Sequence, residues 1–310
     1  MSIPKACATS GGVARLFFPP AVSLTRPALA TVLAVFKRWG RVHRMRKVRR
    51  FAVNSRESNP GVPVDADTAP RPPVVGDRAE FQAAVDRLRT REKAHTRQGD
   101  AIAAARRRLP MVEVDADIEL IGPRGAVTLL DAFEGRRQLI AYYFMWYDGQ
   151  PAPGQCQGCT WCTTQVGELS YLHSRDITFA VLCQGPYDES RRYHDFMGWT
   201  MPWYSARASL EALLDGRETG TMYLICYLRD GDRVFETYWT NMRGVEVMDN
   251  NYALMDLTAY GRQEPWEDSP PGWPQRWGSD DRDAWRINGR PIAQWSRLEA
   301  GRDDDLGAGP

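Results

Sequence analysis

One nearly continuous apolar run, residues 138–146, constrains the fold more than any other part of the sequence. Four of its nine residues are aromatic and one, Ile140, is β-branched, and a run of this type and length is typical of a strand that is covered on both faces. Residues 176–183 repeat the pattern, and residues 160–173 between the two runs fit a helix. The sequence therefore predicts a parallel or mixed α/β sheet at the centre of the chain.

Further elements follow this core in sequence order. Residues 188–197 fit a second helix, and residues 221–228 and 233–239 form a predicted hairpin around the turn at 229–232. The order is thus strand, helix, strand, helix and antiparallel hairpin. With right-handed crossover connections, this order predicts a central mixed sheet with helices on both faces.

The flanking segments divide the chain into three parts. Asp77 and Glu80 have the spacing of a capping box, so we expect a helix from there to about residue 108. Residues 112–121 alternate enough to form an edge strand or hairpin arm, and residues 127–133 form a short apolar element. We expect a disordered basic leader and Pro-rich linker over 1–73, a domain with an N-terminal helical extension over 74–262, and an irregular Trp/Pro/Asp-rich C-terminal tail over 263–310.

Charge is distributed unevenly along the chain. Residues 1–50 hold eleven of the 40 Lys and Arg and none of the 39 Asp and Glu, so the remainder carries a net charge of −10. Residues 51–310 therefore lack the basic surface expected of a nucleic-acid-binding domain. The basic leader is either an anchor for an anionic membrane or a nucleic acid or, as we favour, a disordered leader, untranslated if Met45 is the true start.

The sequence contains no apolar run of the ~18–20 residues that a bilayer span requires. The best candidate, residues 27–36, is too short, and its charges follow it rather than precede it as in a signal peptide. Six cysteines are also too few for a disulfide scaffold in a chain of this length. We therefore expect a cytoplasmic protein with no membrane span.

The main candidate site is a group of three cysteines, Cys156, Cys159 and Cys162, which follows the strand at 138–146. Residues three apart in the first turn of a helix lie on one face, where two sulfurs can bond. Free N–H groups and the helix dipole stabilise a thiolate there and lower its pKa. A Cys-x-x-Cys at a strand-to-helix junction therefore predicts redox chemistry.

Two overlapping pairs share Cys159, and the start of the helix decides which pair is active. If the helix starts near Cys156, that residue is the attacking thiol and Cys159 resolves, which is the alternative we favour. A start near Cys159 moves both roles to Cys159 and Cys162. Cys156 and Cys162 lie six residues apart, on different helix faces, so they cannot easily bridge each other.

Other side chains are weaker candidates. Cys183 ends the second buried strand and could join the three cysteines as a ligand of zinc or an iron–sulfur cluster, although zinc sites usually have two separated cysteine pairs. We expect Cys226 in the core, and His173 and His194 at the surface or hydrogen-bonded. The tryptophans near the motif are expected to pack rather than to line a substrate groove: Trp146, Trp161, Trp199 and Trp203.

Several segments together resemble a known bacterial family. They are residues 139–145, the cysteine segment, and residues 173–179, 196–203 and 252–261. On these segments, residues 75–262 resemble the bacterial family called domain of unknown function 899, usually described as thioredoxin-like. The resemblance implies a thioredoxin fold, with Cys156 and Cys159 at the family's Cys-x-x-Cys and Cys162 as a subgroup addition. Residues 221–223 lack the proline that thioredoxins place before the strand facing the active site.

The sequence leads us to expect a dithiol–disulfide oxidoreductase. Cys156 attacks, Cys159 resolves the mixed disulfide, and Cys162 or Cys183 serves as a spare thiol or relay. No organic cofactor is required, and the expected partner is a thiol or disulfide substrate, either a small molecule or a protein. The alternatives are a thiol peroxidase that uses the same thiolate, a cysteine-ligated zinc or iron–sulfur protein, and an oxidant-sensing module.

Overall fold

The structure, a computed structural model, describes residues 72–275, 277 and 284–307. The leader expected over residues 1–73 therefore lies, except for its last two residues, outside the described residues. Within the described ranges, no helix combines the length and the apolar character that a bilayer span requires.

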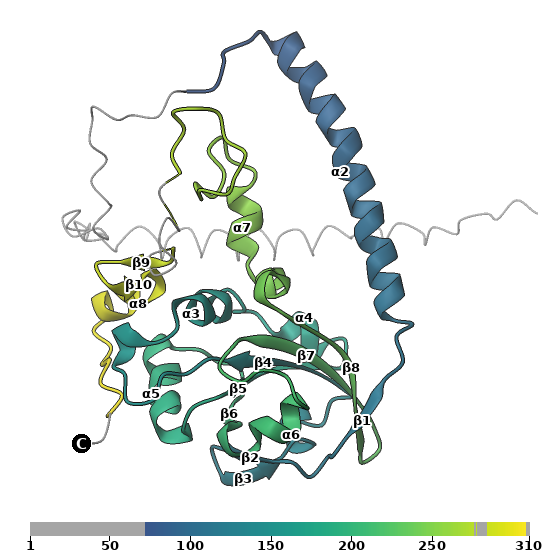
Figure 1. Cartoon of the computed structure of the whole chain (residues 1–310), viewed down its shortest axis with the longest axis vertical. Helices are drawn as coiled ribbons and strands as arrows, with labels where there is room; N and C mark the ends of the chain where they lie inside the picture. Colours follow the sequence, from purple (N-terminus) through teal and green to yellow (C-terminus); the bar gives the residue numbers. More distant parts are fainter. Residues whose placement is uncertain (1–71, 276, 278–283, 308–310) are drawn as a thin grey trace, which may run out of the picture. The chain divides into compact units, whose positions relative to one another are not determined.

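The centre of the molecule is an eight-stranded mixed sheet in the order β1-β8-β7-β4-β5-β6-β2-β3 (Figure 1). β4 is parallel to β5 and antiparallel to β7, and β7 and β8 form the predicted hairpin. The order β8-β7-β4-β5 with these directions is that of the thioredoxin fold, so the predicted fold class is confirmed. The four central strands are β4 (Gln138–Phe144), β5 (Ile177–Cys183), β7 (Tyr223–Asp230) and β8 (Arg233–Asn241). The outer strands are β1 (Val112–Val114), β2 (Glu119–Gly122), β3 (Gly125–Thr128) and β6 (Trp203–Ser205).

Helices cover both faces of the sheet, as expected. Tyr142 and Phe144 of β4 point to the face covered by α3, α4 and α5, while Leu139 and Tyr143 point to the face that carries α6 (Figure 1). All four side chains are fully buried, because each lies on an inner strand under a covered face of the sheet. These helices are α3 (Gln157–Thr164), α4 (Ser170–His173), α5 (Tyr187–Met197) and α6 (Leu210–Leu214).

The sheet is curled, which follows from its first two strands. β1 and β2 are six strand spacings apart in the sheet order, which is about 29 Å in a flat sheet. Only four residues separate Val114 from Glu119, so the chain between them reaches at most about 18 Å. The sheet must therefore bend until its outer strands approach each other.

Two of the predicted segments are each divided in the structure. Residues 112–121 form two strands rather than one, because β1 pairs with β8 and β2 with β3 and β6. Residues 160–173 form two helices, since α3 ends at Thr164 and α4 begins only at Ser170. Gly167 lies in the interruption. Glycine destabilises the interior of a helix, because its backbone loses more conformational entropy on folding than that of other residues.

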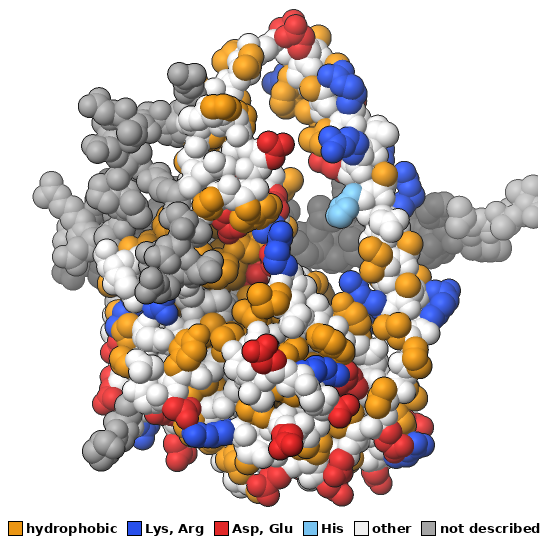
Figure 2. Space-filling view, in the orientation of Figure 1, with side chains coloured by type: hydrophobic (Ala, Val, Ile, Leu, Met, Phe, Trp, Pro, Cys, Tyr) orange, Lys and Arg blue, Asp and Glu red, His pale blue; other side chains and the backbone are white. Residues whose placement is uncertain are grey.

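The helix predicted from the capping box is α2 (Arg78–Arg106). Asp77 accepts a hydrogen bond from the Glu80 N–H (2.8 Å), and the Glu80 carboxylate accepts one from the Asp77 N–H (3.3 Å). No side chain of α2 is buried, and Figure 2 shows basic side chains spread along it. The helix is therefore stabilised mainly by its own backbone bonds and cap.

The segment after β8 is more regular than expected. It begins with the short helices η5 (Met242–Met248) and α7 (Asn250–Met255). Residues 263–310, the expected irregular tail, also contain the hairpin β9 (Arg286–Ile287) and β10 (Arg290–Pro291) and the helix α8 (Ile292–Glu299). The remaining short turns of helix are η2 (Asp131–Phe133), η3 (Ala152–Gly154) and η4 (Arg207–Ser209).

Candidate functional site

The three cysteines lie where the chain leaves β4 and enters α3. Cys156 is the N-cap of α3, and its sulfur accepts a hydrogen bond from the Cys159 N–H at 3.4 Å. The carbonyl of Cys156 accepts both the N–H (3.0 Å) and the hydroxyl (2.8 Å) of Thr160, which fixes the first turn. The helix therefore starts next to Cys156, which is the first of the two alternatives considered for its start.

The surroundings of Cys156 favour its thiolate. The hydrogen bond from the Cys159 side chain is the largest effect that lowers the pKa of Cys156, to about 7. The N–H groups of Cys159 and Gly158 and the positive charge of Arg286 act in the same direction, while burial opposes them. Cys156 is 7% exposed, so it is the most accessible of the three residues without being open to solvent.

Two further side chains face Cys156. Its thiol lies 3.9 Å from the Met145 thioether. The Tyr147 hydroxyl also approaches it: burial raises the pKa of Tyr147, and the charge of a Cys156 thiolate raises it further. Tyr147 is 42% exposed, so it reaches from the site to the surface.

Cys159 is fully buried and lies one helical turn behind Cys156. Its sulfur accepts a hydrogen bond from the Met145 N–H at 3.3 Å, which ties α3 to the end of β4. Burial raises the pKa of Cys159 well above its usual value, and Cys156 adds to the effect. The buried Tyr142 hydroxyl opposes this rise. The pair therefore combines a low-pKa thiol with a second thiol that stays protonated at neutral pH.

Cys162 has a different partner. Its thiol donates to Oδ2 of Asp249 at 3.6 Å, and burial followed by the charge of Asp249 raises the pKa of Cys162 far above its usual value. Asp249 itself is only 4% exposed, and burial raises the pKa of its carboxyl to about 6. Gln165 also donates to Asp249, at 3.3 Å. Cys162 is thus held as a thiol against a buried carboxyl group.

The loop in front of α3 is held by residues that the sequence analysis missed. The amide of Gln155 is fully buried; it accepts from the Tyr147 N–H (3.1 Å) and donates to the carbonyls of Tyr147 and Gln150 (both 2.9 Å). Arg286 donates to the carbonyls of Pro153 and Gln155. An arginine more than 120 residues after the cysteines gives no local sequence signal for such a contact.

Helix α8 braces the same loop. The fully buried amide of Gln294 donates to the Ala152 carbonyl (2.8 Å) and to the Tyr193 hydroxyl (2.6 Å). Trp285 lies against the first turn of α3, where a Cβ on Gly158 would be 3.5 Å from its ring. The segment after residue 284 therefore forms part of the wall around the cysteines.

The cysteines are not arranged as a metal centre. Across the described residues, no three His, Cys, Asp or Glu side chains are grouped so that they could hold a metal ion. Cys183, the expected fourth ligand, is fully buried and accepts a hydrogen bond from the Gly185 N–H at 3.4 Å. The geometry therefore does not provide the ligand set that the zinc or iron–sulfur alternative requires.

The structure also shows the positions of the weaker candidates from the sequence analysis. His194 is buried between Asp195 and the Met201 carbonyl, and burial lowers its pKa. His173 ends the short helix α4. Cys226, which was expected in the core, is only partly buried. The tryptophans mostly pack: Trp199 and Trp203 stack with centroids 5.5 Å apart, Trp146 donates to Glu189, and Trp161 contacts Tyr252 and Trp285.

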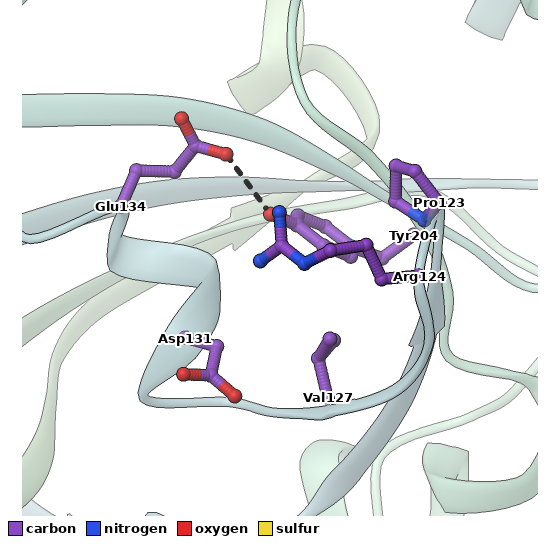
Figure 3. A pocket seen from close by; sticks show the side chains of 6 residues that line it. All are labelled: Pro123, Arg124, Val127, Asp131, Glu134 and Tyr204. Atoms are coloured by element: carbon purple, nitrogen blue, oxygen red, sulfur yellow. Dashed lines mark hydrogen bonds between the residues drawn. The ribbon is translucent and has the colours of Figure 1, made fainter.

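A polar pocket of about 340 Å³ lies at the turn between β2 and β3, and its lining does not include the cysteines (Figure 3). The Tyr204 hydroxyl donates to Glu134 at 3.1 Å. The carboxylate of Asp131 accepts hydrogen bonds from the N–H and hydroxyl of Thr128. The two carboxylates thus already have structural partners, and no cysteine or serine lines the pocket.

Comparisons with known proteins identify a family. The model of the family described as "Bacterial protein of unknown function (DUF899)" matches residues 70–283. No curated protein matches the chain. Similar solved structures include peroxiredoxin Q of Xanthomonas campestris, with 14% identity over 48% of this chain and 97% of that chain at a TM-score of 0.34. Another is a putative thiol:disulfide interchange protein DsbE of Chlorobium tepidum, with 11% identity over 47% and 98% at a TM-score of 0.30.

Proposed function

The chain belongs to the bacterial family DUF899, and we propose that it is a dithiol–disulfide oxidoreductase with Cys156 and Cys159 as its reactive pair. One observation carries the proposal. Cys156 caps α3 with a lowered pKa, and the protonated thiol of Cys159 lies one turn behind and donates to it. This is the arrangement in which one sulfur attacks and its neighbour resolves.

The reaction proceeds in two exchange steps. The Cys156 thiolate attacks one sulfur of a substrate disulfide; the substrate S–S bond breaks, and the released thiolate takes a proton from solvent. Cys159 then gives up its proton and attacks Cys156 in the mixed disulfide, so that the second substrate thiolate leaves and is protonated. The substrate gains two electrons and two protons, the protein holds a Cys156–Cys159 disulfide, and an external dithiol restores the reduced form.

Cys162 does not belong to the reactive pair in this proposal. Its thiol is held against Asp249 and is not part of the first exchange. The proposed substrates are small or protein disulfides, and the proposed compartment is the cytoplasm, where the resting protein has reduced thiols.

Thiol counting tests the proposal. The reduced full-length protein is treated with oxidised glutathione, its free thiols are counted by mass spectrometry after alkylation, and dithiothreitol is then added. We expect a reversible loss of two thiols, mapped to Cys156 and Cys159. Cys156→Ser should abolish the loss, whereas the matched control Cys226→Ser should retain it.

Three outcomes would count against the proposal. A disulfide that excludes Cys156 would assign the wrong pair. Rapid turnover of hydrogen peroxide with dithiothreitol, without turnover of disulfides, would favour the peroxidase alternative. Stoichiometric zinc or iron in anaerobically purified protein would favour a metal site.

A further inference from the structure

An apolar cavity of about 580 Å³ lies on the same face of the sheet as the cysteines, but its lining does not include the three cysteines of the motif. Its floor is formed by side chains of β4, β5, β7 and β8, and its walls by the turn from α3 to α4 and by η5. Its volume is within the range of ~300–1,000 Å³ that is usual for small-molecule sites. The proposed redox reaction makes no use of it.

The lining is strongly apolar. Phe179, Leu224 and Met248 are among the buried side chains that contribute to it, while Val247 is 77% exposed at its edge. Hydrophobic side chains also gather on the surface over α4 and η5 (Figure 2). An open apolar hollow of this size on a soluble domain is characteristic of a ligand site.

Two charged residues line the cavity, Arg106 and Glu168. Glu168 accepts a hydrogen bond from the Ser170 N–H at 2.7 Å, so its carboxylate is engaged at the start of α4. Arg106 forms no ion pair with any part of the chain that the structure describes, and its guanidinium lies 5.0 Å from the centroid of the Tyr238 ring. The lining thus holds a guanidinium that is not ion-paired within the described chain, beside a carboxylate that is hydrogen-bonded to the backbone.

Cys226 lies near this cation in the cavity lining. The thiol lines the cavity together with Arg106 and Tyr238. Burial raises the pKa of Cys226 to about 11, and the positive charge of Arg106 opposes the rise. The guanidinium and the thiol are therefore close enough to interact electrostatically, which makes Cys226 a reporter inside the cavity.

We infer that this cavity binds an amphiphilic monocarboxylate of the fatty-acid type, with its carboxylate at Arg106 and its alkyl chain over the floor formed by Phe179 and Leu224. An alkyl chain matches the apolar lining, and a single anionic head matches the unpaired guanidinium. A carboxylate accepts two parallel, charge-assisted N–H bonds from a guanidinium; a neutral head forms weaker bonds, and a quaternary ammonium head forms none.

Calorimetric titration of the reduced full-length protein tests the inference, with decanoate, hexanoate and decyltrimethylammonium as probes below their micelle concentrations. We expect saturable 1:1 binding of decanoate, with affinity falling about fourfold for each methylene removed. Arg106→Gln should weaken decanoate binding about tenfold. Its neighbour Arg107→Gln, which makes the same change of charge and does not line the cavity, should leave the affinity unchanged.

Protection of Cys226 provides a second readout that is independent of redox activity. Decanoate should slow the reaction of Cys226 with N-ethylmaleimide in the wild-type protein and much less in Arg106→Gln. Absence of saturable binding, equal effects of the two arginine substitutions, equal affinity for decyltrimethylammonium, or no protection of Cys226 would each overturn the inference. A failure of the Cys156–Cys159 reaction would leave it intact, since neither readout uses that pair.

Discussion

At the scale of single residues, the same side-chain type acquires three different chemistries within seven positions. Cys156 accepts hydrogen bonds from the first turn of α3, and Cys159 is fully buried behind it. The Cys162 thiol donates a hydrogen bond to a buried carboxyl group. The differences arise from burial and from hydrogen-bond direction, because all three residues belong to the same short helix segment. Each environment predicts a distinct response to substitution or pH.

The pKa of Cys156 predicts the pH dependence of its reactivity. The thiolate is the species that reacts, so the rate of alkylation by iodoacetamide should rise with pH to half its maximum at about pH 7. Arg286→Gln removes a positive charge that favours the thiolate and should move this midpoint upward. Arg87→Gln, which makes the same change of charge at an exposed position of α2, is the matched control and should leave it in place. A wild-type midpoint near the value of ~8.5 for a free thiol would contradict the prediction.

Asp249 predicts a pH-dependent stability. Burial raises the pKa of its carboxyl from 3.8 to about 6 in the folded protein. Its stabilising contribution is therefore full below the unfolded pKa and is lost as pH rises through about 6. Asp249→Asn does not ionise, so its free energy of unfolding relative to wild type should increase by roughly 2–3 kcal/mol between about pH 4 and about pH 8. Urea denaturation of both proteins measures this difference, and a constant offset would count against it.

At the scale of elements, the position of α3 depends on contacts from both directions along the chain. The Met145 N–H binds Cys159 from the end of β4, whereas Trp285 and α8 approach from the C-terminal segment. The helix has only eight residues, and its N-cap is a cysteine rather than a preferred Ser, Thr, Asp or Asn. Tertiary contacts therefore hold a helix start that local capping alone would leave weak.

Gln294 tests how strongly α8 contributes to the site. Gln294→Leu removes the donor to the Ala152 carbonyl and to the Tyr193 hydroxyl, so we expect a loss of about 1–3 kcal/mol in the free energy of unfolding. Loosening of the loop should also increase the rate at which Cys156 is alkylated at a fixed pH. The exposed substitution Glu299→Gln on the same helix should change neither quantity. Equal alkylation rates in Gln294→Leu and wild type would show that α8 does not shield the cysteine.

At the scale of the whole molecule, the sequence predicts the centre of the fold better than its periphery. The two apolar runs that become β4 and β5, the β7–β8 hairpin and the capping box of α2 are local signals, and all are confirmed. The break between α3 and α4 and the split of residues 112–121 depend on which strands and helices pack together. Periodicity along the chain carries no information on such pairings.

The same distinction applies to the site. The spacing of Cys156, Cys159 and Cys162 and their place after a buried strand can be found by inspecting the sequence. Asp249 and Arg286 influence the thiols, and Gln155 holds the loop in front of them; all three residues were missed. Two of these residues lie 87 or more positions from the thiol they influence, so only the folded chain reveals them.

The bracing of the loop by the C-terminal segment has a practical consequence for anyone who wishes to graft this motif. The family match stops at residue 283, before Arg286 and Gln294. A recipient protein given only the matched stretch would inherit every sulfur of the motif, yet the carbonyls of Ala152, Pro153 and Gln155 would lose the side-chain donors Arg286 and Gln294. Transfer of reactivity to another scaffold thus requires two pieces of the chain, the cysteine turn and the late hairpin with its helix.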